Sequence, residues 1–300
     1  MKISIIIPCY NCSSNITKLL NSFPEGSEFE FILVNDGSTD DTLYFIDDYI
    51  NYSNKNIKLL NIQNVGAAQA RTLGLQNSSG DYIFFCDSDD TIFSDNILFY
   101  FELIKKEKPD LLCFSSIMYN KGESKKTDKV SFDEQMFFSN PDKFLHHRLS
   151  NNNYTAAVWT YIFSKELLIN SNAKFTNRKA HEDHFFTLSL ISHSKKILCN
   201  PNLLYIQNIT PGSLTNSTKN KMYLLSRLEA FIESLSILKE GNFILSKNLY
   251  ITWSLDAFLK LCKDNKISFF QLITSFSFYM VFIKNIKLIS VYIMSKFNFF

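Results

Sequence analysis

The stretch DYIFFCDSDD, residues 81–90, joins an apolar run to three carboxylates. Consecutive aromatic and β-branched residues predict a strand that is buried on both faces, as in a parallel sheet. Asp87, Asp89 and Asp90 would then stand at the end of that strand, where their like charges repel. The cluster is either a polar turn, with Asp90 as N-cap of a helix that begins near Ile92, or a site for Mg²⁺ or Mn²⁺. This stretch alone leaves both interpretations open.

The segments before this stretch alternate between strand-like and helix-like patterns. Strands are expected at 3–8, 29–36, 57–62 and 81–86, and helices at about 14–22, 39–50 and 66–77. This alternation predicts an α/β fold, with a Rossmann-like, mostly parallel sheet and flanking helices. Such sheets bind ligands at the carboxyl ends of their strands, which here carry PCYN, NDGSTD, QNVG and DSDD.

Two of these strand ends carry residues suited to a nucleotide. Asp36 directly follows a buried strand, and its carboxylate can accept hydrogen bonds from a uracil or a ribose, although a capped turn at Gly37 is the alternative. Gly66 opens a helix that contains Arg71 about one turn in, where a helix N-terminus attracts phosphate. Neither GxGxxG nor GxxxxGK[ST] occurs, which argues against an ordinary dinucleotide site or P-loop.

Composition and charge narrow the class of protein. The chain has 300 residues, 46% of them hydrophobic and 20% charged, which indicates a globular protein. A formal net charge of +2 gives no support for a nucleic-acid partner. Only five residues separate Lys2 from Pro8, too few for the apolar core of a signal peptide, so we expect a cytoplasmic protein.

The six cysteines are scattered, which fits buried thiols in a reducing compartment better than a disulfide framework. Cys9 and Cys12 are the exception, because C-x-x-C after a first strand can be a redox motif. A thiol oxidoreductase is therefore a rival interpretation. It would leave Asp36, Asp87 and Asp89 without a role.

Four segments together resemble glycosyltransferase family 2, a group of inverting enzymes with the GT-A fold. They are SIIIPCYN (4–11), ILVNDGSTDDT (32–42), NVGAAQARTLGL (64–75) and DYIFFCDSDD (81–90). The resemblance implies that Pro8, Tyr10 and Asp36 hold the base and ribose of a nucleotide-sugar. It also implies that Asp87 lies near the ribose and that Asp89 is the metal ligand. A cation and the diphosphate that it bridges would relieve the crowding of carboxylates.

Two segments further along the chain resemble the same family. AVWTYIFSKELL (157–168) is similar to its Trp-containing segment, and FTNRKAHEDHFF (175–186) to its Glu-Asp element. The resemblance places Asp183 in the catalytic-base position, with Glu182 beside it as a second catalytic candidate, although ordinary helix capping also explains acidic residues there. His181 stands where the family commonly has Gly. HEDHF lacks the second His of H-E-x-x-H, which excludes a zinc protease.

Two further features leave alternatives open. Trp159 is either a core residue or a partly exposed indole that stacks on an acceptor sugar. YIQNITPGSLT (205–215) resembles a Tyr, Arg, Ser segment of the family, but Gln207 and Asn208 stand where Arg is often found. A phosphate contact from this segment is therefore not expected from the pattern.

The chain divides into a predicted GT-A domain and a helical extension. Residues 1–215 form the GT-A domain, with a nucleotide-sugar-binding half at 1–115 and an acceptor and catalytic half at 116–215; residues 216–300 are helical. The segment 267–300 is rich in aromatic and aliphatic residues interrupted by lysines, which favours peripheral attachment to a membrane. A buried packing helix, an oligomer contact and a membrane span are the alternatives.

We predict a cytoplasmic glycosyltransferase, peripheral on the inner face of the cell membrane and dependent on Mn²⁺ or Mg²⁺. It would move a sugar from a nucleotide-sugar, UDP-linked, to a hydroxyl of a glycan or lipid-linked glycan in surface polysaccharide or lipopolysaccharide biosynthesis. The alternative is a catalytically inactive nucleotide-sugar-binding or scaffolding protein on the same fold. A sugar nucleotidyltransferase is disfavoured because its Gly-rich signature is absent near the N-terminus.

Overall fold

The computed structural model describes residues 1–120, 122–178, 180–209 and 219–267. Its strands are β1 (Ile3–Cys9), β2 (Phe29–Asp36), β3 (Asn56–Ile62), β4 (Tyr82–Phe85), β5 (Thr91–Ile92), β6 (Leu111–Asn120), β7 (Lys125–Val130), β8 (Met136–Phe138), β9 (Tyr161–Ser164) and β10 (Ile197–Ile209). Its α-helices are α1 (Ile16–Asn21), α2 (Thr42–Tyr52), α3 (Ala67–Gln76), α4 (Ser94–Glu107), α5 (Pro141–Ser150), α6 (Lys165–Ser171), α7 (Asp183–His193), α8 (Lys221–Glu240) and α9 (Lys247–Asp264). The strands and helices predicted before residue 86 are confirmed, with boundaries shifted by a few residues.

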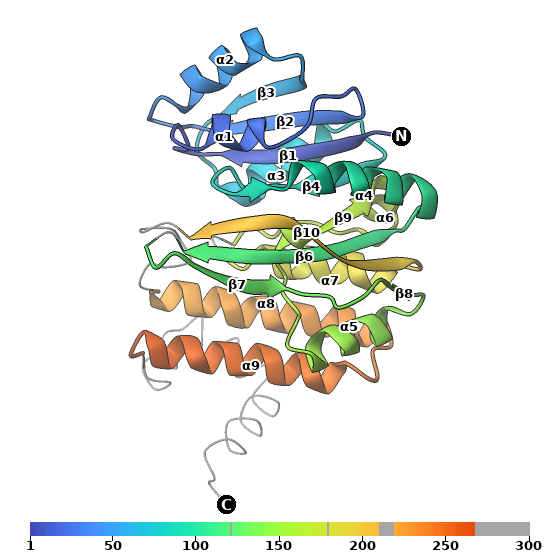
Figure 1. Cartoon of the computed structure of the whole chain (residues 1–300). Coiled ribbons are helices and arrows are strands. Elements are labelled where there is room, and N and C mark those ends of the chain that lie inside the picture. Colours follow the sequence, from blue (N-terminus) through green and yellow to red (C-terminus); the bar gives the residue numbers. More distant parts are fainter. Residues whose placement is uncertain (121, 179, 210–218, 268–300) are drawn as a thin grey trace, which may run out of the picture.

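All of the described strands join one sheet, in the order β3-β2-β1-β4-β9-β6-β10-β5, with β7 beside β6 and β8 beside β10. β1 pairs in parallel with β2 and β4, β2 with β3, and β6 with β10, whereas β9 runs antiparallel between β4 and β6. The long strands therefore point the same way, as predicted. Their carboxyl ends bring the four strand-end segments to one edge of the sheet (Figure 1).

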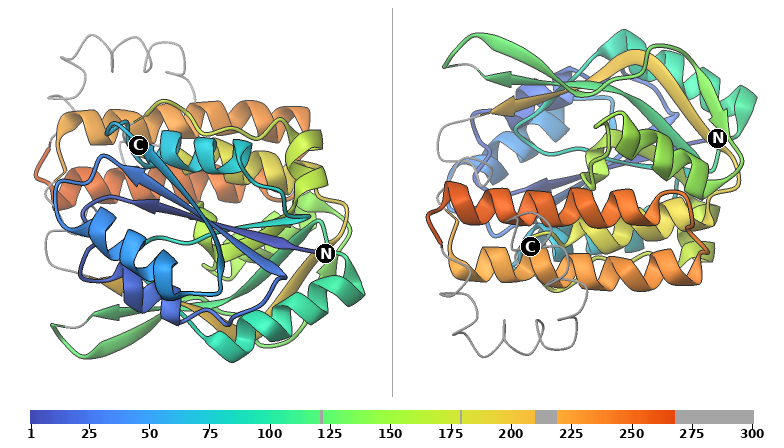
Figure 2. Two further views of the ribbon diagram at one scale, coloured as in Figure 1. Left: turned by 90° about the horizontal axis from the view of Figure 1, so that it is seen from above. Right: turned by 90° about the horizontal axis from the view of Figure 1, so that it is seen from below.

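Helices cover both faces of the sheet, because successive side chains of a strand point to opposite faces. Ile5 and Ile7 of β1 pack in one core with α1, α2 and α4. Ile6, one residue between them, belongs to the core that includes α3, α5, α7, α8 and α9. Strands β2 and β4 are buried throughout and β1 at every position but Pro8, which explains their continuous apolar runs. Figure 2 shows the helices on the two sides of the sheet.

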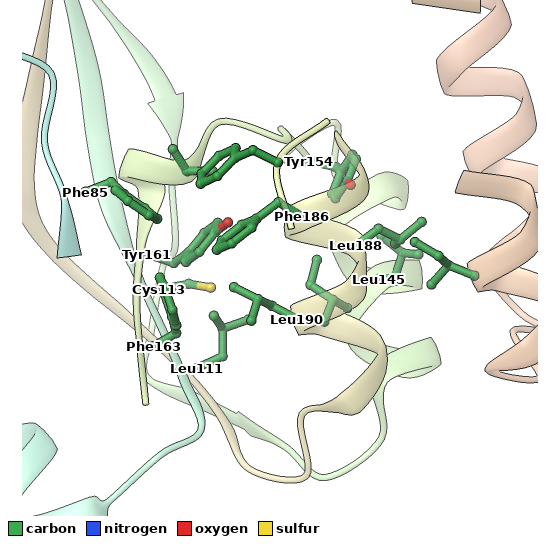
Figure 3. Packing of buried hydrophobic residues seen from close by; sticks show 14 of the residues in the cluster. Phe85, Leu111, Cys113, Leu145, Tyr154, Tyr161, Phe163, Phe186, Leu188 and Leu190 are labelled. Atoms are coloured by element: carbon green, nitrogen blue, oxygen red, sulfur yellow. The ribbon is translucent and has the colours of Figure 1, made fainter. Parts of the chain in front are cut away.

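An aromatic group in the second core ties two distant segments together (Figure 3). Phe186 of α7 lies 5.8 Å from Phe85 at the end of β4 and stacks on Phe175 with 4.4 Å between ring centroids. Phe85 comes two residues before Asp87, and Phe186 three residues after Asp183. Aromatic pairs of this kind contribute about 0.5–1.5 kcal/mol each beyond their buried area. The core thus fixes the start of α7 against the end of β4.

The predicted helical extension is present as α8 and α9, which lie side by side and outside α7 (Figures 1 and 2). Phe231 of α8 and Tyr250 of α9 are fully buried in the same core as α7. Within the described ranges, no helix combines the length and the apolarity needed to cross a membrane. Nearly all of the segment predicted to contact a membrane, residues 268–300, lies outside the described residues.

Candidate active site

The loops that follow β1 and β2 are bonded to each other. Asn11 accepts a hydrogen bond from the Thr39 N–H through its side-chain oxygen at 2.8 Å, and the Cys12 N–H donates to Thr42 Oγ1 at 2.7 Å. Tyr10, a predicted base contact, is 50% exposed beside them, whereas Pro8 lies within β1. The two loops predicted to bind the base are therefore held together, and the ring of Tyr10 is accessible to a ligand.

Asp36 holds the loop that leads into α3. Its two carboxylate oxygens accept the N–H groups of Val65 and Gly66 at 2.7 and 2.9 Å, and its side chain is buried. Gly37 and Gly66 both have positive φ, at 67° and 93°, and a Cβ on Gly37 would lie 2.7 Å from the Asn64 nitrogen. Carboxylates have further lone pairs, so a base or ribose contact by Asp36 stays a prediction.

Arg71 of α3 joins the two halves of the predicted site. Its Nη2 lies 2.7 Å from Asp87 Oδ1, and its Nη1 lies 3.2 Å from Glu182 Oε1. Burial alone would lower the pKa of this guanidinium, but the carboxylates of Asp87 and Glu182 more than offset it, and the pKa is raised. Arg71 therefore stays charged and links the end of β4 to the start of α7.

Asp90 is an internal anchor, so the interpretation that makes it the N-cap of a helix near Ile92, one of the two left open by the sequence, is wrong. The helix α4 begins at Ser94, and Asp90 is buried, with its oxygens accepting the Tyr205 hydroxyl and the Asn208 N–H at 2.7 Å each. Burial, followed by the charges of Asp87 and Asp89, raises the pKa of Asp90 to about 9. Burial and the neighbouring carboxylates thus disfavour ionisation of Asp90, whereas the two hydrogen bonds that it accepts favour it.

The chemistry of the turn fits a cation that arrives with a diphosphate. Among the described residues, no group of three or more His, Cys, Asp or Glu side chains could hold a metal ion. With Asp90 committed to the protein and Asp87 paired with Arg71, the turn offers few hard oxygen ligands. Mg²⁺ and Mn²⁺ are commonly held by one or two carboxylates together with substrate phosphates. Asp89, which the resemblance marks as the metal ligand, fits that donor set.

Glu182 and Asp183 lie at the start of α7, as predicted. Burial, followed by the charge of Glu182, raises the pKa of Asp183 to about 7, while Arg71 and Arg227 act in the opposite direction. A general base is most effective when its pKa lies near the working pH.

His181, which replaces the Gly expected before this pair, has a φ of 59°, a conformation that favours Gly. His181 therefore adopts a left-handed backbone conformation that Gly reaches at lower cost.

Two residues near the site, Arg227 and Lys129, were not recognised as site residues from the sequence patterns. Arg227 of α8 is buried and donates a hydrogen bond to the ring of His184, and its guanidinium lies 4.7 Å from the ring of Trp253. Burial lowers the pKa of Lys129 of β7, and the charge of Asp183 offsets only part of this shift. No local motif marks these residues, since tertiary packing brings them to Asp183. The one signal in the sequence that could have marked Arg227 is its position inside the apolar stripe of α8.

Two alternatives left open by the sequence are settled by burial. Trp159 is 4% exposed and stacks on Tyr205 with 4.5 Å between ring centroids, so it is a core residue and cannot stack on an acceptor sugar. Cys9 and Cys12 are free thiols with exposures of 0% and 3%. A dithiol buried in this way is not presented to a disulfide substrate, which argues against the oxidoreductase interpretation.

Residues 4–170 match the sequence family described as Glycosyl transferase family 2. The chain belongs to glycosyltransferase family 2. It is 25% identical over 265 residues to glycosyltransferase GlyA of Streptococcus pneumoniae, across 83% of this chain and 36% of that protein. It is 30% identical over 205 residues to the poly(ribitol-phosphate) β-N-acetylglucosaminyltransferase TarS of Staphylococcus aureus, across 66% of this chain and 34% of that protein. The chain thus spans about a third of the length of these two relatives.

The family 2 fold is also found in solved structures. Residues 1–349 of S. aureus TarS, in complex with UDP-GlcNAc, superpose with a TM-score of 0.66 at 20% identity, covering 96% of this chain and 89% of that one. The complex of the same fragment with UDP gives a TM-score of 0.63 at 21% identity, with the same coverage of both chains. These superpositions support the predicted GT-A fold.

We expect the activity of this family member to fall in acid, as Asp183 becomes protonated. A base must be ionised to accept a proton, so kcat/KM should drop about tenfold per pH unit below a pKa near 7. The measurement is a profile of kcat/KM between pH 5 and 9 at saturating cation. The acid limb should disappear in the residual activity of Asp183→Asn, and a wild-type profile that is flat from pH 5 to 8 would contradict the assignment.

Proposed function

We propose that this glycosyltransferase moves a sugar with inversion from a UDP-linked donor to a hydroxyl of a glycan or lipid-linked glycan acceptor in surface-polysaccharide synthesis. The donor would lie along the carboxyl ends of β1, β2 and β4, with Tyr10 and Asp36 at the base and ribose. Relatives named as acting on poly(ribitol-phosphate), and the TarS complexes with UDP and UDP-GlcNAc, support this class of donor and acceptor.

The observation that carries this proposal is the bridge made by Arg71. One guanidinium contacts Asp87, predicted to lie near the donor ribose, and Glu182, the neighbour of the predicted base. A single displacement needs the donor and the base to be held in a fixed relation, because the acceptor oxygen must attack from the face opposite the leaving group. Arg71 and the aromatic group around Phe85 and Phe186 supply that fixed relation.

Asp183 would remove the proton of the acceptor hydroxyl as that oxygen attacks the anomeric carbon. Burial raises its pKa to about 7, so the carboxylate is a stronger base than an exposed aspartate, is about half ionised at pH 7 and is ionised above that pH. Glu182 is tied to Arg71 at 3.2 Å and therefore acts on the position of Asp183 and of the bridge. A divalent cation, when bound at Asp89, neutralises charge on the departing diphosphate.

A panel of nucleotide sugars tests the donor. Purified protein is incubated with each sugar nucleotide and Mn²⁺ or Mg²⁺, and the release of nucleoside diphosphate is measured with and without candidate acceptors. Release from UDP-sugars that requires a cation supports the proposal, and a preference for a different nucleotide would overturn the donor assignment. Binding of UDP-sugars without release under any condition would instead favour the inactive, nucleotide-sugar-binding alternative.

Replacing Asp36 by Ala is expected to raise KM for the donor about tenfold or more, with a smaller effect on kcat. The substitution leaves the N–H groups of Val65 and Gly66 without an acceptor, which costs about 1–3 kcal/mol in this loop. Contacts to base and ribose are equal in ground and transition states, so their loss appears in KM. Steady-state kinetics at varied donor concentration gives both constants.

Asp110 supplies the matched control for Asp36. Its Oδ2 also accepts two consecutive N–H groups, of Lys195 and Lys196 at 2.6 and 2.8 Å, but at the amino end of β6. Asp110→Ala should therefore lower stability without changing KM for the donor. A loss confined to kcat in Asp36→Ala, or an equal rise of KM in both variants, would refute the donor role.

Removal of residues 267–300 is expected to move the protein from the membrane fraction to the supernatant. The expected cause is the loss of aromatic and aliphatic side chains interspersed with Lys284, Lys287 and Lys296, a composition that favours the membrane interface. The measurement is co-sedimentation with vesicles that contain anionic lipid. Exchange of the three lysines for Glu in the full chain should also weaken binding, and a folded truncation that sediments like the full chain would exclude the anchor.

A further inference from the structure

The hydroxyl of Tyr205 lies at the centre of the DSDD turn, residues 87–90. It accepts the Asp87 N–H at 2.9 Å and donates to Asp90 Oδ2 at 2.7 Å. Tyr205 has no solvent exposure, so both bonds form away from water, and the loss of either would leave a buried polar group unpaired. One side chain of β10 thus holds both ends of the turn.

Asn208, three residues later in β10, holds the middle of the same turn. Its side-chain Nδ2 donates to the Asp89 carbonyl at 2.9 Å and to Thr91 Oγ1 at 3.1 Å. Its backbone N–H donates to Asp90 Oδ1 at 2.7 Å. Together with Tyr205, it makes five hydrogen bonds to residues 87–91, and the pairing of β10 with β5 continues the attachment at Thr91 and Ile92.

The ring of Tyr205 is itself fixed by its neighbours. Trp159 stacks on it at 4.5 Å with an interplanar angle of 15°, and Phe84 meets it edge-on at 6.2 Å. The register of β10 with β6 shifts between Asn200 and Tyr205, and Leu204 and Tyr205 are both fully buried. Such an irregularity re-aims side chains at a site. The hydroxyl therefore has little freedom to leave the turn.

We propose that Tyr205 and Asn208 are positioning residues that hold the DSDD turn in the conformation that binds the donor diphosphate and its cation. This inference rests on the proposed function. The bonds from β10 reach the backbone at Asp87 and Asp89 and the carboxyl of Asp90, and the carboxylate of Asp87 turns instead to Arg71. Metal ligands in proteins depend on such supporting hydrogen bonds, and their loss lowers metal affinity about 10- to 100-fold.

Two substitutions test this inference. Tyr205→Phe removes only the hydroxyl and keeps the stack on Trp159, and Asn208→Ala removes the side-chain amide but keeps the backbone bond to Asp90. Tyr100→Phe is the matched control, because Tyr100 is also fully buried and its hydroxyl donates to the Asn202 carbonyl of β10 at 2.6 Å, before the register settles at Tyr205. All three variants should lose stability to a similar degree.

Two readouts separate positioning from a general loss of stability. The first is hydrogen exchange of the amides of residues 86–92 in the protein without ligand. The second is the affinity for Mn²⁺ in the presence of UDP, followed by electron paramagnetic resonance. We expect faster exchange in this segment and an affinity about 10- to 100-fold weaker in Tyr205→Phe and Asn208→Ala, with neither change in Tyr100→Phe.

Faster exchange with unchanged affinity for Mn²⁺ and UDP would overturn the inference, because the bonds would then be merely structural. Wild-type exchange in both variants would overturn it as well. If the wild-type protein binds no Mn²⁺ with UDP, the proposed donor is wrong, and the exchange arm then decides alone whether β10 holds the turn. An equal loss of affinity for Mn²⁺ in Tyr100→Phe would also count against the positioning role.

Discussion

Asp183→Asn is expected to lower kcat by roughly 10² or more, while the affinity for the donor stays nearly unchanged. Asparagine keeps the size and hydrogen-bonding shape of the side chain and removes its basicity. Because Asp183 lies in α7, apart from the strand ends predicted to hold the nucleotide, its loss should not disturb donor binding. Single-turnover rates with acceptor present give the chemical step, and a direct titration with UDP gives the affinity.

Two other carboxylates, Glu182 and Asp90, serve as comparisons for Asp183. Glu182→Gln weakens the bond to Arg71, so it should lower the rate less than Asp183→Asn and also affect the donor. Asp90→Asn disturbs a buried contact with Tyr205 and should act on stability and cation binding, because Asp90 is only 4% exposed. A dead Glu182→Gln beside an active Asp183→Asn would move the base by one residue. Activity in all three variants would refute the inverting mechanism.

The half of the fold that is predicted to bind the nucleotide could be predicted closely from the sequence. Strands β1, β2 and β4 are buried on both faces, so each is a short apolar run bounded by polar loops, as in residues 29–36 and 81–86. The family motifs then placed Asp36, Arg71 and Asp87 at one edge of the sheet, and the contacts of Arg71 agree with that placement. Strong local patterns were sufficient there.

The contacts of the site could be predicted less well, because they join residues far apart in the chain. One interpretation of the sequence made Asp90 a helix cap, yet its partners Tyr205 and Asn208 lie more than 110 positions away. Asn208 stands where the family often has Arg, and the pattern suggested a lost phosphate contact, whereas the side chain bonds to the DSDD turn. Local sequence carries no information about which strand will lie beside that turn.

Asp89→Asn is expected to lower turnover by about 10²–10³ while leaving the fold intact. A bound cation stabilises the departing diphosphate by several kcal/mol, and each 1.36 kcal/mol corresponds to a factor of ten in rate. The substitution removes one negative charge at a strand end and creates no cavity, so the free energy of unfolding should change by about 0.5 kcal/mol or less. Thermal unfolding and initial rates over a range of Mn²⁺ concentrations measure both effects.

Asp95→Asn provides the control, because Asp95 is an exposed carboxylate in the first turn of α4, six residues after Asp89. It should retain wild-type activity and wild-type dependence on Mn²⁺. Since amide oxygens are weaker ligands than carboxylates for hard cations, excess Mn²⁺ should restore part of the activity of Asp89→Asn and none of the activity of Asp183→Asn. That difference separates loss of a ligand from loss of a base. Full activity of Asp89→Asn, or wild-type activity that persists in EDTA, would show that the transfer does not use a cation at this turn.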